Sequence, residues 1–182
     1  NASRLILLNA PDTVEAAPRP QTVEDRWILS RLQRAKAEAA ARIERFDFPK
    51  LALGLYDFVF SELCDWYLEL VKPRLYDGDE DAQATVLHVL RETLALAHPV
   101  IPFVTEEVWS LRFASGERDL LAGQRMPGVD ERLIDDGAEE ALARAIEAVR
   151  VLRGWRESVD VRPGAWVPGV LQADGYAETA HL

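Results

Sequence analysis

Apolar residues in the first half of the chain recur every three or four positions, which is the period of an amphipathic helix. Thr22 precedes the first such run and Asp25 follows three residues later, an imperfect form of the residue pair that caps helix starts. Charged residues fall on the other faces of this run. The pattern predicts a long helix that begins near Thr22 and buries one face, formed by Ile28, Leu32, Ala35, Ala39, Ile43 and Phe46.

The letters "FDFP" at residues 46–49 interrupt this pattern, and Pro49 suits the first turn of a second helix. Apolar residues keep the helical spacing from there to Pro73, where we expect the second helix to end. A third long helix is predicted up to the letters "HPVIP" at residues 98–102, and a short helix after it. These helices are expected to pack against one another through their apolar faces.

The two ends of the chain show other patterns. Residues 1–9 form an apolar segment that predicts a helix, and the three prolines within residues 10–21 indicate a loop. After a connection without periodicity, residues 138–159 again have the pattern of an amphipathic helix. The β-branched and aromatic residues at 165–173 favour a strand.

At 182 residues, with 48% hydrophobic and 29% charged residues, the chain has the composition of a globular protein with one sizeable core. We therefore expect an all-α helical bundle over residues 1–136 and, over residues 137–182, a helix with a small mixed α/β tail. No apolar run approaches the ~20 residues that span a bilayer, so we expect no membrane association. The single cysteine, Cys64, cannot form an internal disulfide, which fits a cytoplasmic protein.

The net charge of −10 argues against a nucleic-acid-binding surface over the whole chain. The charge is unevenly distributed, however. The first fifty residues carry nine Lys and Arg against seven Asp and Glu, whereas the rest of the chain is acidic. If the chain contacts a polyanion, its first fifty residues are the best candidate.

The chain shows no pattern that indicates a catalytic or metal centre. Its three histidines are scattered, its glycines form no phosphate-binding loop, and no nucleophile, base and oxyanion donor come together in the sequence. We therefore predict neither catalytic residues nor a metal site. Asp65 stands beside Trp66 and Tyr67, and we expect its carboxylate to be a buried hydrogen-bond acceptor between two helices.

Four residues near the proline-rich loop combine guanidinium groups with a flat aromatic ring, namely Arg4, Trp27, Arg31 and Arg34. Proteins recognise single-stranded RNA with such groups, because its bases stack on aromatic or guanidinium planes and expose their edges. The alternative is that Trp27 belongs to the core and the arginines form a solvated face. Spacing alone favours this alternative, so the RNA hypothesis needs independent support.

The stretch "YDFVFSELCDWYLELVKPRL" at residues 56–75 resembles the anticodon-binding domain of the class I valyl-tRNA synthetases. Isoleucyl relatives share the architecture but differ from this chain within that stretch, so the resemblance favours the valyl family. Met126 stands before Pro127 where the family often has tryptophan. Four more segments are similar to the family and occur in its order: "NASRLILL" at 1–8, "DRWILSRL" at 25–32, "TLALAHPVIPFVTEEVW" at 93–109 and "AVRVLRGWRESVDVRPG" at 148–164.

The resemblance implies that the chain is a tRNA anticodon recognition module. In the family, this bundle binds the anticodon of valine tRNA, and the last two bases of that anticodon are A and C. We accordingly expect Arg4 and either Arg31 or Arg34 to contact phosphates or base edges. Trp27 is expected to stack on a base, and the loop at 10–21 to close over the anticodon. The alternatives are the same domain of an isoleucyl-tRNA synthetase and a helical scaffold for protein partners without a role in RNA binding.

The resemblance also implies what the longer enzyme does. A full-length valine–tRNA ligase attaches valine to its tRNA with ATP and Mg²⁺, in catalytic and editing domains whose motifs this chain lacks. We expect the chain itself to be noncatalytic and to hold no cofactor. We expect the full-length enzyme to be a cytoplasmic monomer that binds neither membranes nor DNA. The absence of methionine before "NASRLILLNA" leads us to expect that the chain starts within a helix that enters the bundle.

Overall fold

The computed structural model describes residues 1–116, 118–162, 164–170, 176 and 179, and every regular element within them is a helix. This confirms the expected all-α fold for the described residues. The α-helices are α1 (Ala2–Asn9), α2 (Val23–Glu44), α3 (Phe48–Asp57), α4 (Leu68–Tyr76), α5 (Glu80–Ala97), α6 (Pro102–Arg112) and α7 (Asp136–Ser158). A π-helix, η1 (Phe58–Tyr67), joins α3 to α4, and two short 3-10 turns, η2 (Leu121–Gly123) and η3 (Glu131–Leu133), precede α7.

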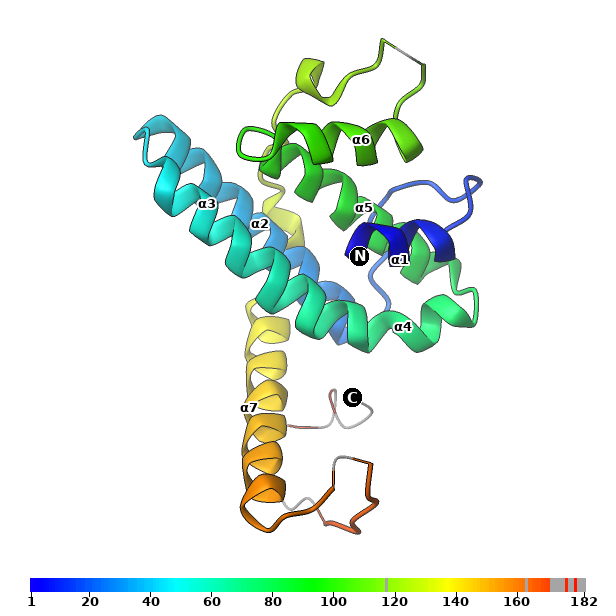
Figure 1. The fold of residues 1–182 in the computed structure, drawn as a ribbon, viewed down its shortest axis with the longest axis vertical. Coiled ribbons are helices and arrows are strands. Elements are labelled where there is room, and N and C mark those ends of the chain that lie inside the picture. The colour runs from blue at the N-terminus through cyan, green and yellow to red at the C-terminus, as the bar shows by residue number, and fades with distance from the viewer. Residues whose placement is uncertain (117, 163, 171–175, 177–178, 180–182) are drawn as a thin grey trace.

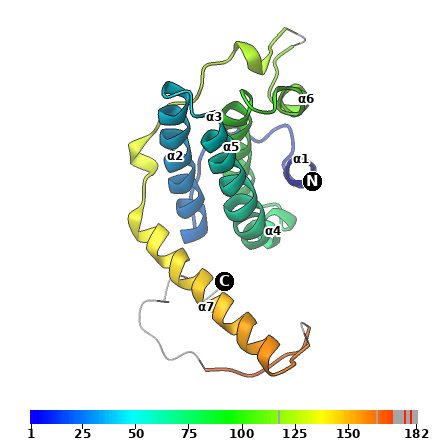
Figure 2. The same ribbon diagram turned by 60° about the vertical axis from the view of Figure 1, so that its left-hand side comes forward.

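The helices form a bundle from which α7 projects (Figure 1, Figure 2). Helix α2 packs against α3, η1, α5 and the start of α7, while α1 packs against α5 and α4. The buried residues of α7 are Ala138, Ala141 and Leu142, all near its start. The rest of this helix extends away from the bundle (Figure 1). None of the helices in the described part of the chain is long and apolar enough to cross a membrane.

Helix α2 follows its predicted pattern closely. The Thr22 hydroxyl caps its start by accepting a hydrogen bond from the backbone N–H of Asp25 at 3.4 Å. On the predicted apolar face, Ile28 and Leu32 are fully buried. Phe46 departs from the prediction, because the helix ends at Glu44 and Phe46 adopts a left-handed φ of 56°. This turn leaves the Phe46 ring 78% exposed at the tip of the α2–α3 hairpin.

Residues 48–76 form one continuous helical rod of α3, η1 and α4 (Figure 1). Within the π-helical part, Glu62 and Tyr67 both reach α2, where they bind Arg31 and Asp25. The predicted end at Pro73 is wrong, since α4 continues through it to Tyr76. A proline removes one backbone hydrogen bond, and the burial of residues such as Leu75 on this helix outweighs that loss.

A buried carboxylate joins three parts of the bundle. The Asp25 side chain is fully buried, and its Oδ1 accepts a hydrogen bond from the Tyr67 hydroxyl at 2.9 Å. Its Oδ2 accepts from Arg74 Nη1 at 2.8 Å and from the Gln21 backbone N–H at 3.1 Å. Burial and the neighbouring Asp25 carboxylate raise the pKa of the Tyr67 phenol well above its ordinary value. Asp65, for which we predicted such a role, is exposed.

The described part of the C-terminal tail contains no strand. Residues 165–170 have no regular secondary structure, and residues 171–173 of the predicted strand lie outside the described residues. Trp166 is fully exposed. A strand needs a neighbouring strand to bond its backbone groups, and the described residues contain none.

Removing the buried carboxylate, or one of its hydrogen-bond donors, should destabilise the bundle. We expect Tyr67→Phe to lower the free energy of unfolding by about 1–3 kcal/mol, because Asp25 loses a buried hydrogen bond. Asp25→Ala should cost about 3–5 kcal/mol, since it removes three hydrogen bonds at a buried position, even though Arg74 keeps its bond to Asp79. Asp65→Ala is the control and should change stability by less than about 0.5 kcal/mol. Urea unfolding measures all three, and an equal loss for Asp65→Ala and Asp25→Ala would contradict the assignment.

Candidate RNA-binding site

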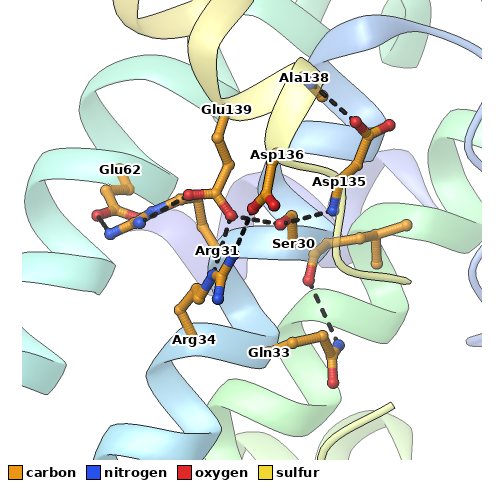
Figure 3. A network of polar contacts seen from close by, with 10 residues as sticks. Ser30, Arg31, Gln33, Arg34, Glu62, Asp135, Asp136, Ala138 and Glu139 are labelled. Atoms are coloured by element: carbon orange, nitrogen blue, oxygen red, sulfur yellow. Dashed lines mark hydrogen bonds and ion pairs between the residues drawn. The ribbon is translucent and has the colours of Figure 1, made fainter. Parts of the chain in front are cut away.

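Two of the predicted RNA-binding residues lie on α2 where the start of α7 crosses it (Figure 3). Arg31 binds Glu62 through two hydrogen bonds, from Nε at 2.9 Å and from Nη2 at 2.7 Å, and reaches Glu139 with Nη1 at 3.1 Å. Arg34 donates from Nε to Glu139 at 3.3 Å and from Nη2 to Asp136. Both guanidinium groups are therefore held by carboxylates of the protein itself.

The local sequence of α7 explains why carboxylates meet these arginines. Asp135 caps the helix by accepting a hydrogen bond from the backbone N–H of Ala138 at 2.9 Å. Acidic residues are favoured in the first turn of a helix by its dipole, and Asp136 and Glu139 occupy that turn. Ser30 on α2 fixes the position of this turn, because its hydroxyl donates to Glu139 and accepts from the Asp135 backbone N–H at 3.0 Å.

The electrostatics of this cluster favour the charged forms of its members. The hydrogen bond to Glu62 is the main reason that the pKa of Arg31 is raised above its ordinary value. Partial burial opposes ionisation of Glu139, but hydrogen bonds from Ser30, Arg31 and Arg34 outweigh it and lower the pKa of the Glu139 carboxyl. Both shifts favour the charged forms, the guanidinium of Arg31 and the carboxylate of Glu139.

Trp27 lies in the same region but is largely covered. Its side chain is only 5% exposed, and it lines a cleft of about 520 Å³ between α2, η1 and α7. Trp66 and Arg150 line the same cleft, and the guanidinium of Arg153 lies 5.7 Å from the centre of the Trp66 ring. Stacking of a base on Trp27 stays a prediction, and it requires this cleft to open.

Arg4 lies apart from the other three predicted residues. It is exposed on α1, which packs against α5 and α4 and not against the α2–α7 junction. Among the described residues none forms an ion pair or hydrogen bond with its guanidinium group. The structure thus brings Trp27, Arg31 and Arg34 together and leaves Arg4 as a separate, solvated cation.

A second concave surface lies beside α1, and the sequence analysis missed it. This α1–α4 groove has a volume of about 750 Å³. Two half-exposed aromatic rings, Phe60 and Tyr76, line it, and Phe60 stacks on Tyr56 with ring centres 4.4 Å apart. Lys72 and Ser3 add polar groups to the lining. A signal was present in the sequence, because Lys72 and Tyr76 are four residues apart and so share a face of their helix.

The loop at 10–21 lies on the side of α5 and α6. The backbone N–H of Arg19 donates to the Thr85 hydroxyl on α5 at 3.0 Å. Arg112 on α6 donates from Nη2 to the carbonyl of Val14 at 2.6 Å. The loop is thus held by hydrogen bonds at both of these points. Its predicted closure over an anticodon is not tested by these contacts and stays a prediction.

Comparison with known proteins places these observations in a family. The family model of the anticodon-binding domain of tRNA ligases matches residues 25–171. The valine–tRNA ligase of Geobacter sulfurreducens is 40% identical over 191 residues, which cover 100% of this chain and 21% of that protein. The valine–tRNA ligase of Thermosynechococcus vestitus is 37% identical over 200 residues, which cover 100% of this chain and 22% of that protein. The chain therefore spans about a fifth of the length of these relatives.

The two arginines of the α2–α7 junction should differ in their effect on stability. Arg31→Ala removes both hydrogen bonds to the partly buried Glu62 and one of those to Glu139, and should lower the free energy of unfolding by about 1.5–3 kcal/mol. Arg34 pairs with the 80% exposed Asp136, and Arg34→Ala should cost about 1 kcal/mol or less. Urea unfolding of both variants measures the difference. Equal losses of unfolding free energy would show that the burial of the carboxylate partners does not determine how much each arginine stabilises the protein.

Proposed function

Because the chain belongs to the family of anticodon-binding domains of tRNA ligases, we propose that it recognises the anticodon of valine tRNA. The observation that carries this proposal is the alignment of the whole chain with valine–tRNA ligases at 37–40% identity. These relatives do not favour the isoleucyl alternative. A scaffold without a role in RNA binding also fits the match less well, since the matched family is described by its binding of anticodons.

The α1–α4 groove is the surface best suited to unpaired bases. Its half-exposed rings, Phe60 and Tyr76, offer faces for stacking, which contributes about 1–3 kcal/mol per base in other proteins. Ser3 and Leu5 line the groove from α1, and Arg4 lies between them in the sequence. We propose that Arg4 contacts a phosphate or a base edge at the border of this groove.

The α2–α7 junction is proposed as a second contact region. Arg31 and Arg34 would bind phosphates or base edges there, and Trp27 would stack on a base once the cleft opens. The loop at 10–21 would close over the anticodon from the α5–α6 side. Tight reading of the last two anticodon bases, with a loosely held first base, needs only a few such contacts. An acidic remainder of the surface then limits unspecific RNA binding.

The complete enzyme is proposed to be a valine–tRNA ligase that uses ATP and Mg²⁺. We propose that this chain itself holds neither cofactor, since its glycines form no phosphate-binding loop. The chain would instead orient the tRNA so that its acceptor end reaches a distant active site. Residues 1–136 would form the recognition bundle, and residues 137–182, with a mixed tail, would lead on from it. We place this enzyme in the cytoplasm, as a monomer without membrane or DNA partners.

Exchanging the last two anticodon bases should weaken binding. We expect the valine tRNA anticodon stem-loop to bind at least tenfold more tightly than the same stem-loop with A and C exchanged, since a lost base contact costs about 1–3 kcal/mol. Fluorescence anisotropy with labelled stem-loops measures both affinities. Equal affinities would contradict base recognition. Tight binding that does not respond to salt would contradict phosphate contacts as well.

Removing the solvated cation of α1 should weaken the same interaction. We expect Arg4→Ala to reduce affinity for the valine stem-loop by about 1–3 kcal/mol if Arg4 binds a base edge. If it binds a phosphate, the salt dependence of the affinity should become shallower by about one counterion. Arg45→Ala is the matched control, because it removes an exposed arginine of the same charge at the far end of α2. Equal effects of the two variants would remove Arg4 from the site.

A further inference from the structure

The start of α7 contacts the bundle through ion pairs and through a few apolar side chains, among them the partly buried Ile146. Only three side chains of α7 are buried, two of them alanines, so little apolar surface holds this helix in place. Polar contacts also position its first turn: Asp136 binds Arg34, and Glu139 binds both Arg31 and Arg34 (Figure 3). Next to them, Asp135 pairs with Arg26. A helix attached in this way is sensitive to any anion that competes for the same guanidinium groups.

The ion pairs at this junction are accessible to such a competitor. The Arg34 side chain is 44% exposed and that of its partner Asp136 is 80% exposed. Ion pairs in such positions contribute little net stability, because water already solvates both charges. A phosphate diester offers a guanidinium group the same kind of paired oxygen acceptors as a carboxylate does. RNA that reaches Arg34 can therefore replace Asp136 at a small cost.

Glu139 couples the two arginines to the helix. Its two carboxylate oxygens bind Arg31 and Arg34, and Ser30 donates to the same side chain. Arg31 keeps its bidentate contact with Glu62 when Glu139 leaves, so the guanidinium group remains oriented in the cleft. The first turn of α7 then keeps only the contacts of Asp135, with Arg26 and with Ser30, among these polar contacts to α2.

We propose that the first turn of α7 is an autoinhibitory clamp, in which Asp136 and Glu139 occupy Arg34 and Arg31 at the positions that RNA phosphates take when RNA binds. Binding exchanges one set of anions for the other and releases the first turn of α7 from α2. The same release opens the cleft over Trp27, because α7 forms one wall of it. This proposal rests on the proposed function, since the competing anion is the phosphate backbone of the tRNA.

The affinity test uses the intact protein and the valine tRNA anticodon stem-loop. Asp136→Asn and Glu139→Gln should each raise the affinity about three- to fivefold, because each removes a competing carboxylate. Glu140→Gln is the matched control: it removes the same charge from the same turn, but its side chain pairs with Arg144. In an Arg34→Ala background, Asp136→Asn should give no gain beyond that of the control. Equal affinities for the three single variants would overturn the clamp.

Hydrogen exchange provides a second measurement. A general effect of charge on RNA affinity would not change the exchange rates of backbone amides. On addition of the stem-loop to the unsubstituted protein, the backbone amides of residues 138–142 should exchange at least several times faster, while those of α2 do not. Slower exchange at residues 138–142 would overturn the proposal, because RNA would then tighten the junction. Should Glu139→Gln fail to fold, Asp136→Asn decides the affinity test, since the Asp136 side chain is exposed.

The outcomes separate this proposal from the proposed function. If the unsubstituted protein binds the stem-loop and the clamp variants match Glu140→Gln, the clamp fails and anticodon binding stands. If neither the unsubstituted protein nor any clamp variant binds the stem-loop, the proposed function fails and the clamp fails with it. If only the clamp variants bind, both proposals are supported.

Discussion

The buried carboxylate of Asp25 is the constraint on which the arrangement of the bundle depends. A buried carboxylate costs free energy unless hydrogen-bond donors surround it, so three segments must each place a donor at one point. The π-helical turn brings Tyr67 there. The continuation of α4 through Pro73 brings Arg74, the very next residue. The bundle therefore tolerates both irregular features, the π-helix η1 and the proline inside α4. Each of them lies in the segment that places one of these two donors against the start of α2.

On the surface of the bundle, the arginines of α2 are also bound by carboxylates of the protein itself. The chain is acidic overall, yet Arg26, Arg31 and Arg34 each pair with carboxylates near the start of α7. Such pairing keeps the cations oriented and keeps them from binding polyanions unspecifically. It also means that their number in the sequence overstates the free positive charge of the surface.

Much of the fold could be predicted from the sequence, and the failures have definite causes. The apolar period located the helices, and Thr22 and Pro49 marked the starts of α2 and α3, because caps and first turns are local features. The expected end at Pro73 was wrong because tertiary burial compensated for a lost backbone bond. Phe46 was placed on the apolar face, but a left-handed turn directed it outward. At Pro73 the burial of the helix against the bundle decided the outcome, whereas at Phe46 a local turn did, closed by backbone hydrogen bonds from residues 46 and 47 to the end of α2.

The amino-acid sequence by itself determined the helical class, the positions of most helices and the resemblance to a family. Periodicity, caps and motifs depend only on residues that are close together in the sequence. Only the tertiary structure decided which groups meet. It made Asp25, and not Asp65, the buried acceptor, and it paired Arg31 and Arg34 with carboxylates that are more than a hundred residues away in the chain. It also assembled the α1–α4 groove from helices distant in sequence. The physical reason is that the partners of a charge or ring are set by how helices cross, and no local pattern encodes a crossing.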